Sequence, residues 1–498
     1  MAGTTPLLNA QERDAATPSW SATATFVLSL AIPNAMRMVL ILSNEVINML
    51  ILSRSTSDPD AIAAVGLGNM MQNVFGLSIS LGLLSAFDTF VSQAYGAGDH
   101  AMSIVVLQRG RLLATLQLLW IIPLLYYSDV ILCALGQDAH VAAYAGQYNQ
   151  AALLGLPGFV WQEAFRSFLG NRSEVVAPLV VSLITSLLHV VWCYYFVMVC
   201  HLGNQGVGFA NAVTWTLGFL ILAIYVMATA GLHNLSRRDL ISTSANAWRD
   251  WRSYLSIAVP STIQMCGEWW YFEIIALVVG YLGPVPLAAH VGTLNYVSLA
   301  FMPIIGISQS AATAVGQAIG SESTQSALRS VAVCLVAALI VMGFVSVGSV
   351  LFRSTIAGAY SQDESTQMTI QLLLLIYYPF VGMLDSVQNV MSGIMRGFGR
   401  QNEALWIYII TFYGVMLPLG YALALPLSVG VTGVWYAMAV GLSLADIMFL
   451  ILLFSIKQQS RVLPFSPPLL QRQSSSSSHS SYTHPRVSKG SFDMTESV

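Results

Sequence analysis

Three carboxylates in the second half of the chain lie where the sequence is otherwise apolar. Glu268 and Glu273 belong to MCGEWWYFE (265–273), and Asp385 follows YYPFVGML (377–384). A charge at the centre of a membrane costs at least about 2.5–3.5 kcal/mol, so such groups usually face a cavity and serve a function. Burial favours the protonated acid, and a neighbouring carboxylate strengthens this effect. Such a group can hold a proton or attract a cation, and this competition is the physical basis of antiport.

The spacing of these acids predicts how their helices present them. Glu268 and Glu273 are five residues apart, which places them about 140° apart around a helix. We therefore expect one to face a cleft and the other the interior of its helix bundle. Pro260, and Pro379 with Gly382, predict bends in the two helices that carry the acids. The aromatic residues 269–272 could offer cation–π faces, although at most one or two should contact a substrate.

Further ionisable side chains fall within apolar stretches. We expect Glu163 to pair with Arg166, three residues later on the same helix. Glu45 lies in a polar patch with Asn44 and could pair with Arg37, so a structural and a functional role both stay open for it. The remaining candidates are Asp88 near a helix end, expected to be structural, His189 and His290, expected to be buried hydrogen-bonding groups, and Asp446, for which binding and structural roles are equally open.

The composition identifies the environment of the chain. Of 498 residues, 56% are hydrophobic and 9% are charged, against about 25% charged residues in soluble domains. The net charge of −3 argues against a nucleic-acid partner, which would require a basic face. The five cysteines show no C-x-x-C spacing, so we expect neither disulfides nor a metal site. We find no nucleophile cluster and no phosphate-binding loop, so the chain is predicted to be no enzyme and to need no cofactor.

Hydropathy predicts an all-α integral membrane protein with twelve transmembrane helices, since about 20 mostly apolar residues span a bilayer. The predicted spans are 22–52, 62–90, 105–127, 143–168, 175–200, 207–230, 254–282, 287–316, 328–352, 367–395, 404–425 and 431–456. The polar segment 231–253 divides them into helices 1–6 (22–230) and 7–12 (254–457). Residues 1–21 form an N-terminal tail, and the Ser-rich segment 458–498 is expected to be disordered.

Basic residues predict the orientation. With the N-terminus in the cytosol, all basic residues except Arg37, Arg54 and Arg353 fall on the cytosolic side, as the positive-inside rule requires. Both termini are then cytosolic, and no cleavable signal peptide is expected. The plasma membrane and the membrane of a vacuole-like acidic organelle both fit, because each has an acidic far side.

The two halves of the chain resemble each other. TFVSQAYG (89–96) matches TAVGQAIG (313–320), and Pro33 and Met38 match Pro260 and Met265 at a nearly equal offset. These matches predict a duplicated six-helix unit. Because six is even, both copies have the same orientation in the membrane, which predicts two pseudo-symmetric lobes around a central cavity. Transporters built from repeats bind substrate near such an interface and alternate its access by rocking the halves.

Several segments together resemble the multidrug and toxic compound extrusion (MATE) transporters of eukaryotic type, over residues 25–455. The matching segments are AIPNAM (31–36), SQAYGAG (92–98), Gln108-Arg109, VPSTIQMCGEWWYFE (259–273), QAIG (317–320), DSVQNVMSGIMRGFGRQ (385–401), YGVMLPLG (413–420) and GVTGVWYAM (430–438). The resemblance implies efflux of organic cations or xenobiotics from two six-helix lobes in exchange for protons. It also implies a monomer in the lipid bilayer, whose energy source is the proton gradient.

Carried onto this chain, the resemblance assigns proton and substrate binding to Glu268, Glu273 and Asp385. Weaker candidates for lining the cavity are Gln264, Tyr271, Gln388, Tyr296 with Asn295, and Glu45 with Asn44. The chain departs from the family at LILSRSTSD (50–58), where a Gly-rich turn is usual, and at Glu45. A second coupling carboxylate or a different substrate in the first lobe would explain these departures.

Other functions of the same architecture stay open. A carrier of organic acids or secondary metabolites, or a sodium-coupled exporter, would share these features. A lipid or oligosaccharide flippase would need a large basic cavity, but Arg37 is the only intramembrane cation, because the other basic residues of the predicted spans are assigned to the cytosolic side. A channel would show a filter-like repeat, which is missing.

Overall fold

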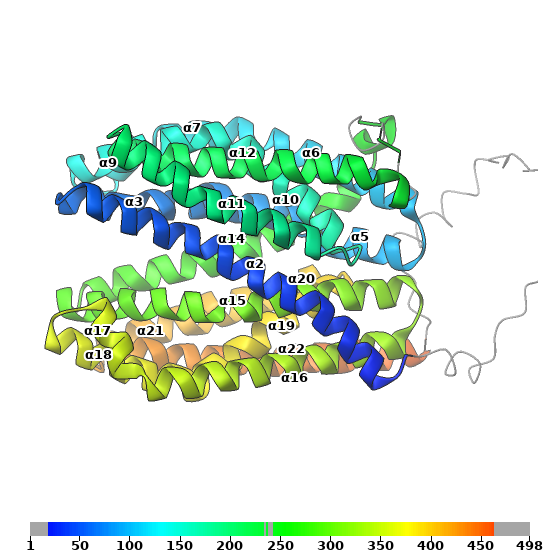
Figure 1. Cartoon of the computed structure of the whole chain (residues 1–498). Coiled ribbons are helices and arrows are strands. Elements are labelled where there is room, and N and C mark those ends of the chain that lie inside the picture. Colours follow the sequence, from blue (N-terminus) through cyan, green and yellow to red (C-terminus); the bar gives the residue numbers. More distant parts are fainter. Residues whose placement is uncertain (1–17, 234–235, 238–242, 463–498) are drawn as a thin grey trace, which may run out of the picture. The chain divides into compact units, whose positions relative to one another are not determined.

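The structure, a computed structural model, describes residues 18–233, 236–237 and 243–462. Most of the predicted tails (1–21 and 458–498) and part of the polar linker lie outside the described residues. Where they are described, residues 20–21 and 458–462 are helical, so the helices extend slightly into the predicted tails. The described part of the chain is almost entirely helical (Figure 1). The prediction of an all-α protein is confirmed.

The helices before the linker form what we call the N-lobe, and those after it form the C-lobe. The N-lobe contains α2 (Trp20–Ser55), α3 (Pro59–Gln72), η1 (Asn73–Leu77), α4 (Ser78–Leu84), α5 (Phe87–Gly96), α6 (His100–Leu116), α7 (Leu118–Tyr126), α8 (Ser128–Ala134), α9 (Ala139–Ala152), η2 (Leu153–Gly155), α10 (Leu156–Gly170), α11 (Val176–Tyr194), η3 (Tyr195–Val199) and α12 (Gly203–Thr229). The described parts of the linker include two short 3-10 turns, η4 (Ala230–His233) and η5 (Ala245–Trp248).

The C-lobe has longer uninterrupted helices. It contains α14 (Trp251–Gly280), α15 (Pro284–Gly320), α16 (Thr324–Leu351), α17 (Arg353–Tyr360), α18 (Glu364–Ile376), η6 (Tyr377–Val381), α19 (Gly382–Phe398), α20 (Gln401–Tyr408), η7 (Ile409–Met416), α21 (Leu417–Ala424) and α22 (Val431–Val462). The bend predicted at Pro379 takes the form of the π-helical segment η6, directly before the helix that carries Asp385. By contrast, α14 continues as one helix through Pro260.

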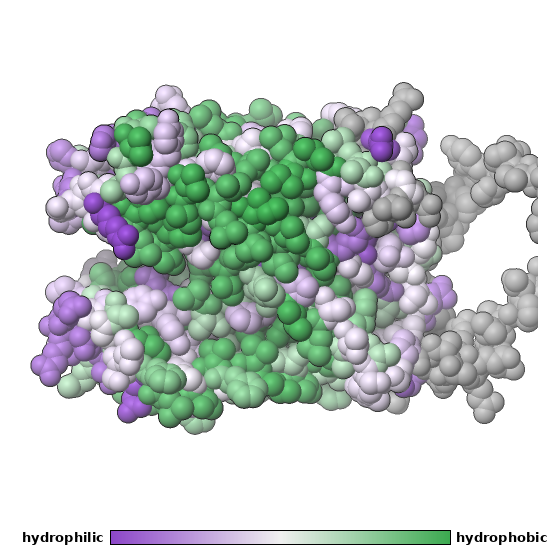
Figure 2. Space-filling model, viewed as in Figure 1, coloured by the Kyte–Doolittle hydropathy of each residue, from purple (hydrophilic) through white to green (hydrophobic). Residues whose placement is uncertain are grey.

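The helices are long and apolar enough to cross a membrane. Within the described ranges, ten helical runs meet that condition, and α9 with α10 and the long α14 complete the twelve predicted spans. A broad apolar band covers the middle of the molecule, and polar side chains gather at both ends (Figure 2). Large apolar side chains such as Leu119, Phe344 and Leu277 are 69–77% exposed on this surface. The chain is a multi-pass integral membrane protein.

Helix α2 packs against both lobes (Figure 1). Val27, Leu30 and Ala31 in its first half belong to the buried core of the C-lobe. Leu52 in its last turn belongs to a buried cluster of the N-lobe. The helix therefore contacts α15 and α16 on one side and α11 on the other, which makes it a structural link between the lobes.

Candidate functional site

Two of the predicted carboxylates interact electrostatically in the C-lobe. Glu268 of α14 and Asp385 of α19 are both half-buried and lie within electrostatic reach of each other. The hydroxyl of Tyr377 in η6 donates a 2.8 Å hydrogen bond to Oδ2 of Asp385. Because η6 shifts the helical register just before α19, it brings Tyr377 and Asp385 together although eight residues separate them. The site therefore has two acids and a buried phenol that stabilises an ionised carboxylate.

Glu273 lies apart from this pair. Its side chain is exposed, on the same face of α14 as the exposed side chains of Trp270 and Leu277. By contrast, Tyr271 has no exposed surface and packs edge-on against Phe412 in the C-lobe core. The expected division of Glu268 and Glu273 between two faces of the helix is thus what the structure contains.

Among the weaker cavity candidates of the C-lobe, Gln264 and Gln388 are buried, Tyr296 is half-buried and Asn295 is exposed. Gln264 donates a 2.7 Å hydrogen bond to the Ser392 hydroxyl, which joins α14 to α19. Gln388 has no exposed surface and lies one turn after Asp385. The hydroxyl of Tyr296 is 2.8 Å from that of Ser349. Their role in lining a cavity, like that of Tyr271, stays a prediction.

Glu45 does not pair with Arg37, so that prediction is wrong. Arg37 Nη1 lies 3.9 Å from Oε1 of Glu163, and its Nη2 donates a 3.1 Å hydrogen bond to Gln309 of α15. Glu163 also forms the predicted ion pair with Arg166, at 2.6 Å. Helix α2 points the Arg37 side chain toward α10 and α15, because the residue lies on the buried face of the helix.

Glu45 and Asn44 instead line a cavity of about 100 Å³ inside the N-lobe. The other polar lining groups are mostly amides and hydroxyls, among them Asn69, Gln72 and Asn211. The cavity therefore combines carboxylates with many neutral oxygen atoms, which can solvate a cation. Its walls come from several N-lobe helices, which the sequence alone could not bring together.

The two histidines differ in their surroundings. His189 is buried between the Thr214 hydroxyl, at 2.8 Å, and Oδ1 of Asn48, at 2.9 Å, which confirms the predicted hydrogen-bonding role. His290 has no exposed surface, but neither ring nitrogen has a hydrogen-bond partner among the described residues. It packs edge-on against Trp435, so the predicted hydrogen bonds of His290 are not present.

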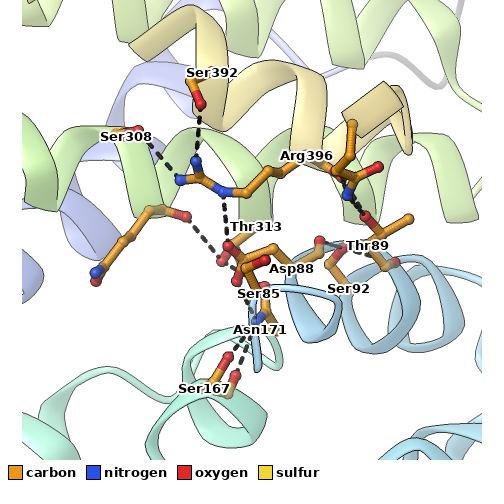
Figure 3. Close-up of polar contacts among 12 residues, drawn as sticks. Ser85, Asp88, Thr89, Ser92, Ser167, Asn171, Ser308, Thr313, Ser392 and Arg396 are labelled. Atoms are coloured by element: carbon orange, nitrogen blue, oxygen red, sulfur yellow. Dashed lines mark hydrogen bonds and ion pairs between the residues drawn. The ribbon is translucent and has the colours of Figure 1, made fainter. Parts of the chain in front are cut away.

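An ion pair joins the lobes at the end of the bundle where residues 18 and 462 lie, which we call the terminal end. Arg396 Nε of α19 donates a 3.0 Å hydrogen bond to Oδ2 of Asp88 in α5, as Figure 3 shows. Asn171 donates to the other Asp88 oxygen at 3.0 Å and accepts from Thr313 of α15 at 3.1 Å. Ser392 accepts a further bond from Arg396.

This contact was the main functional feature missed by sequence reasoning. Asp88 was assigned a structural role without a partner, and Arg396 was used only to predict orientation. A signal was nevertheless present, because Asp88 directly precedes the repeated segment TFVSQAYG (89–96) and Arg396 lies in the motif DSVQNVMSGIMRGFGRQ (385–401). Only the packing of α5 against α19 shows that these two segments meet.

The repeated segments also contact each other reciprocally. A Cβ atom added at Gly96 would lie 2.1 Å from the carbonyl oxygen of Gln317, and one at Gly320 would lie 2.0 Å from that of Gln93. Gly96 corresponds to Gly320, and Gln93 to Gln317, in the sequence repeat. Equivalent residues thus exchange equivalent contacts, as expected across a pseudo-two-fold axis. Glycine is required here because the helices approach backbone to backbone.

The ionisable and thiol side chains of the described ranges form no further cluster that could hold a metal. No three His, Cys, Asp or Glu side chains there form a group that could hold a metal ion. All five cysteines are free thiols.

Comparisons with known proteins agree with the repeat and the fold. The MatE family profile matches the chain twice, over residues 33–195 and 260–422. The chain is 27% identical over 395 residues to "Multidrug and toxin extrusion protein 1" of Danio rerio, covering 79% of this chain and 66% of that protein. It is 29% identical over 395 residues to "Protein DETOXIFICATION 16" of Arabidopsis thaliana, covering 78% and 79%.

Among solved structures, the eukaryotic MATE transporter AtDTX14 superposes with a TM-score of 0.81 at 21% identity, over 89% of this chain and all of that chain. The chain spans slightly less than two thirds of the length of its animal relatives, 66% for the Danio rerio protein and 64% for "Multidrug and toxin extrusion protein 2" of Oryctolagus cuniculus. Because the profile matches both halves and covers more than half of the chain, the chain belongs to the MatE family.

Proposed function

We propose that this protein is a secondary antiporter that exports organic cations or xenobiotics in exchange for protons. The observation that carries the proposal is the placement of Glu268 and Asp385 together in the C-lobe, with the Tyr377 hydroxyl on Asp385. Two acids that interact electrostatically are not readily ionised together. A proton and an organic cation would then compete for the same negative charge, and occupancy by one would favour release of the other.

The arrangement of the lobes supports alternating access. At the terminal end the lobes are joined by Asp88 with Arg396 and by the glycine contacts of α5 with α15. At the opposite end, Figure 2 shows the surface hollowed between the two halves. We infer that this conformation is open away from the termini, and that exchange requires the terminal-end contacts to separate. Helix α2, which packs against both lobes, would be the element that bends or rotates.

The substrate is proposed to be cationic. The intramembrane Arg37 is buried, with 2% of its surface exposed, and its charge faces Glu163. It therefore offers little attraction to an anionic substrate, which disfavours a carrier of organic acids or a flippase. The names of the animal relatives, which refer to multidrug and toxin extrusion, support a xenobiotic substrate. Sodium remains the alternative coupling ion, since carboxylates bind Na⁺ as well as protons.

The orientation and setting remain proposals. The basic residues of the terminal end, such as Arg172, Arg329 and Arg400, would lie on the cytosolic side under the positive-inside rule. We propose a monomer in the plasma membrane or in the membrane of an acidic organelle. In either setting protons enter the hollowed side, and the exported compound leaves through it.

The test is uptake of a fluorescent organic cation by proteoliposomes that contain the full chain. An imposed pH gradient should drive uptake without sodium, and Asp385→Asn should abolish it. Glu364→Gln removes an exposed carboxylate of the same lobe and should leave uptake unchanged. Dependence on sodium rather than pH would exclude proton coupling, and normal uptake by Asp385→Asn would show that the carboxylate is structural.

Glu273 needs a separate variant, because its exposed side chain does not join the half-buried pair of Glu268 and Asp385. Glu273→Gln should also abolish exchange if its charge guides the cation toward Glu268 and Asp385. Delivery to the membrane and the size-exclusion profile of the purified variant check that folding is intact. If Glu273→Gln transports normally and Glu268→Gln is inactive, only Glu268 and Asp385 couple proton and cation binding.

A further inference from the structure

Asp446 is an acid that the proposed mechanism does not yet use. It lies at the middle of α22 (Val431–Val462), with 7% of its surface exposed. Its Oδ1 atom is buried and has no hydrogen-bond partner among the described residues. The flanking residues Leu442 and Phe449 are buried as well, so Asp446 belongs to the face of α22 that is directed into the C-lobe.

The same face of α22 contacts the proton site on both sides of Asp446. Trp435 is eleven residues earlier, which places it within about 20° of Asp446 around the helix. Its ring packs edge-on against Tyr377, with 5.6 Å between ring centroids, and Tyr377 donates to Asp385. One turn later, Phe449 packs against Tyr408 at 6.3 Å. Asp446 thus lies between two residues that pack on the walls of the site.

Asp446 and Asp385 lie within electrostatic reach of each other. The titratable groups that face this region from the elements packed on α22 are His290 of α15, Tyr377 and Tyr378 of η6, Asp385 of α19 and Tyr408 of α20. Glu268 of α14 interacts electrostatically with Tyr408. Tyr413 of η7 is directed away, since it donates to the Gly267 carbonyl. Glu364 of α18 and Tyr421 of α21 are exposed. Asp446 is therefore a third acid of the C-lobe, which interacts with Asp385 as Glu268 does.

Polar atoms without partners surround this group. Both amide atoms of Gln388, the indole nitrogen of Trp435 and both ring nitrogens of His290 are buried and have no hydrogen-bond partner within the described part of the chain. Each of these three side chains has no exposed surface. Unpaired buried polar groups are rare in proteins and call for an explanation. Here they supply donors and acceptors next to acids whose charge would change during transport.

We propose that Asp446 is a third carboxylate of the C-lobe proton site and that it tunes how readily Asp385 binds a proton. The inference rests on the proposed function. A proton that arrives from water would bind a carboxylate oxygen of the Asp385–Asp446 pair, and binding of the organic cation would return it to water. Because two interacting acids titrate as a pair, removal of one negative charge makes proton loss from the other easier.

The test is the pH profile of cation uptake by Asp446→Asn in proteoliposomes. The pH of half-maximal exchange should fall by about one unit, a tenfold rise in the required proton concentration. The maximal rate should stay within about twofold, because Asp385 is still present. Asp446→Glu should restore the original profile, and Glu364→Gln should not change it. If Asp446 had only a structural role, Asp446→Asn would alter stability but would leave the pH of half-maximal exchange unchanged.

The outcomes separate this inference from the proposed function. If Asp385→Asn is inactive and Asp446→Asn has the wild-type profile, the role of Asp446 is refuted and the proposed function stands. If neither variant changes uptake, both fail. Should Asp446→Asn not fold, protons released by the purified Asp446→Ser and wild-type proteins on addition of the cation can be counted with a pH dye. Identical release over the whole pH range would overturn the proposal, and a shifted release curve would support it.

Discussion

Asp88 and Arg396 form a 3.0 Å ion pair between α5 and α19, although 308 residues separate them in the chain. Both side chains are partly shielded, with 16% and 15% of their surfaces exposed. Asn171 and Ser392 occupy further hydrogen-bonding positions of the two groups. The pair lies at the terminal end and is the charged contact that holds the N-lobe against the C-lobe there.

We predict that Asp88→Asn weakens closure of the terminal end. An exposed ion pair stabilises a fold by up to about 1 kcal/mol, and removal of one partner of a buried pair costs about 3–5 kcal/mol. For this partly buried pair we expect the closed terminal end to lose roughly 1–2 kcal/mol of stability. Spin labels at Ala97→Cys and Ser321→Cys, one exposed site on each lobe, can report the separation by pulsed electron resonance. The exposed Cys133 and Cys200 are replaced by serine in this background.

The matched control for this pair is the charge reversal. Asp88→Arg alone should open the terminal end, and Asp88→Arg with Arg396→Asp should recover part of the closed population. An unchanged distance distribution in Asp88→Arg would mean that apolar packing alone closes this end.

A second prediction about the same interface concerns Gly96 and Gly320, the glycines of the reciprocal contact. Gly96→Ala places a methyl group 2.1 Å from the Gln317 carbonyl oxygen, and overpacking of this kind typically costs about 1–3 kcal/mol. The variant should therefore disfavour the closed terminal end and slow exchange. Gly348→Ala in α16 has open space around the added carbon and should behave as wild type. Similar label distances in both variants would contradict the prediction.

Tyr377→Phe should change the pH dependence of transport while the fold is retained. The phenol hydroxyl donates to Asp385 and so stabilises the ionised acid. Without this bond the carboxylate holds its proton more strongly, and the pH of half-maximal exchange should rise by about one unit. Tyr421→Phe removes an exposed hydroxyl of α21 and is the control. A midpoint that does not move would show that the hydrogen bond has no part in coupling.

Glu45→Gln tests the N-lobe cavity. The carboxylate lines that cavity together with neutral amides and hydroxyls, and it belongs to the opposite lobe from Asp385. We expect a several-fold rise in the KM for the organic cation, because an attractive charge is lost, with no change in the pH midpoint. Initial uptake rates over a range of cation concentrations and pH values give both quantities. A shifted midpoint would instead assign Glu45 to proton coupling.

Much of the architecture follows from the sequence because local physical rules decide it. A span of about 20 apolar residues has to become a helix in lipid, where each backbone polar group needs an internal partner. The twelve spans, the duplicated unit and the ion pair of Glu163 with Arg166 all follow from such short-range patterns. The three acids of helices 7 and 10 were also recognisable, because ionisable residues are rare in apolar segments.

Only the tertiary structure decided which of these groups meet. Glu268 is half-buried and interacts with Asp385 while Glu273 is exposed, and Arg37 joins Glu163 rather than Glu45. Asp88 forms an ion pair with Arg396, and Asp446 of α22 interacts electrostatically with Asp385. These contacts depend on how helices rotate and pack against one another, which is set by side-chain shape over many residues at once. Helical periodicity in the sequence indicates the faces of each helix, but the partner of each face is settled by the packing of the whole bundle.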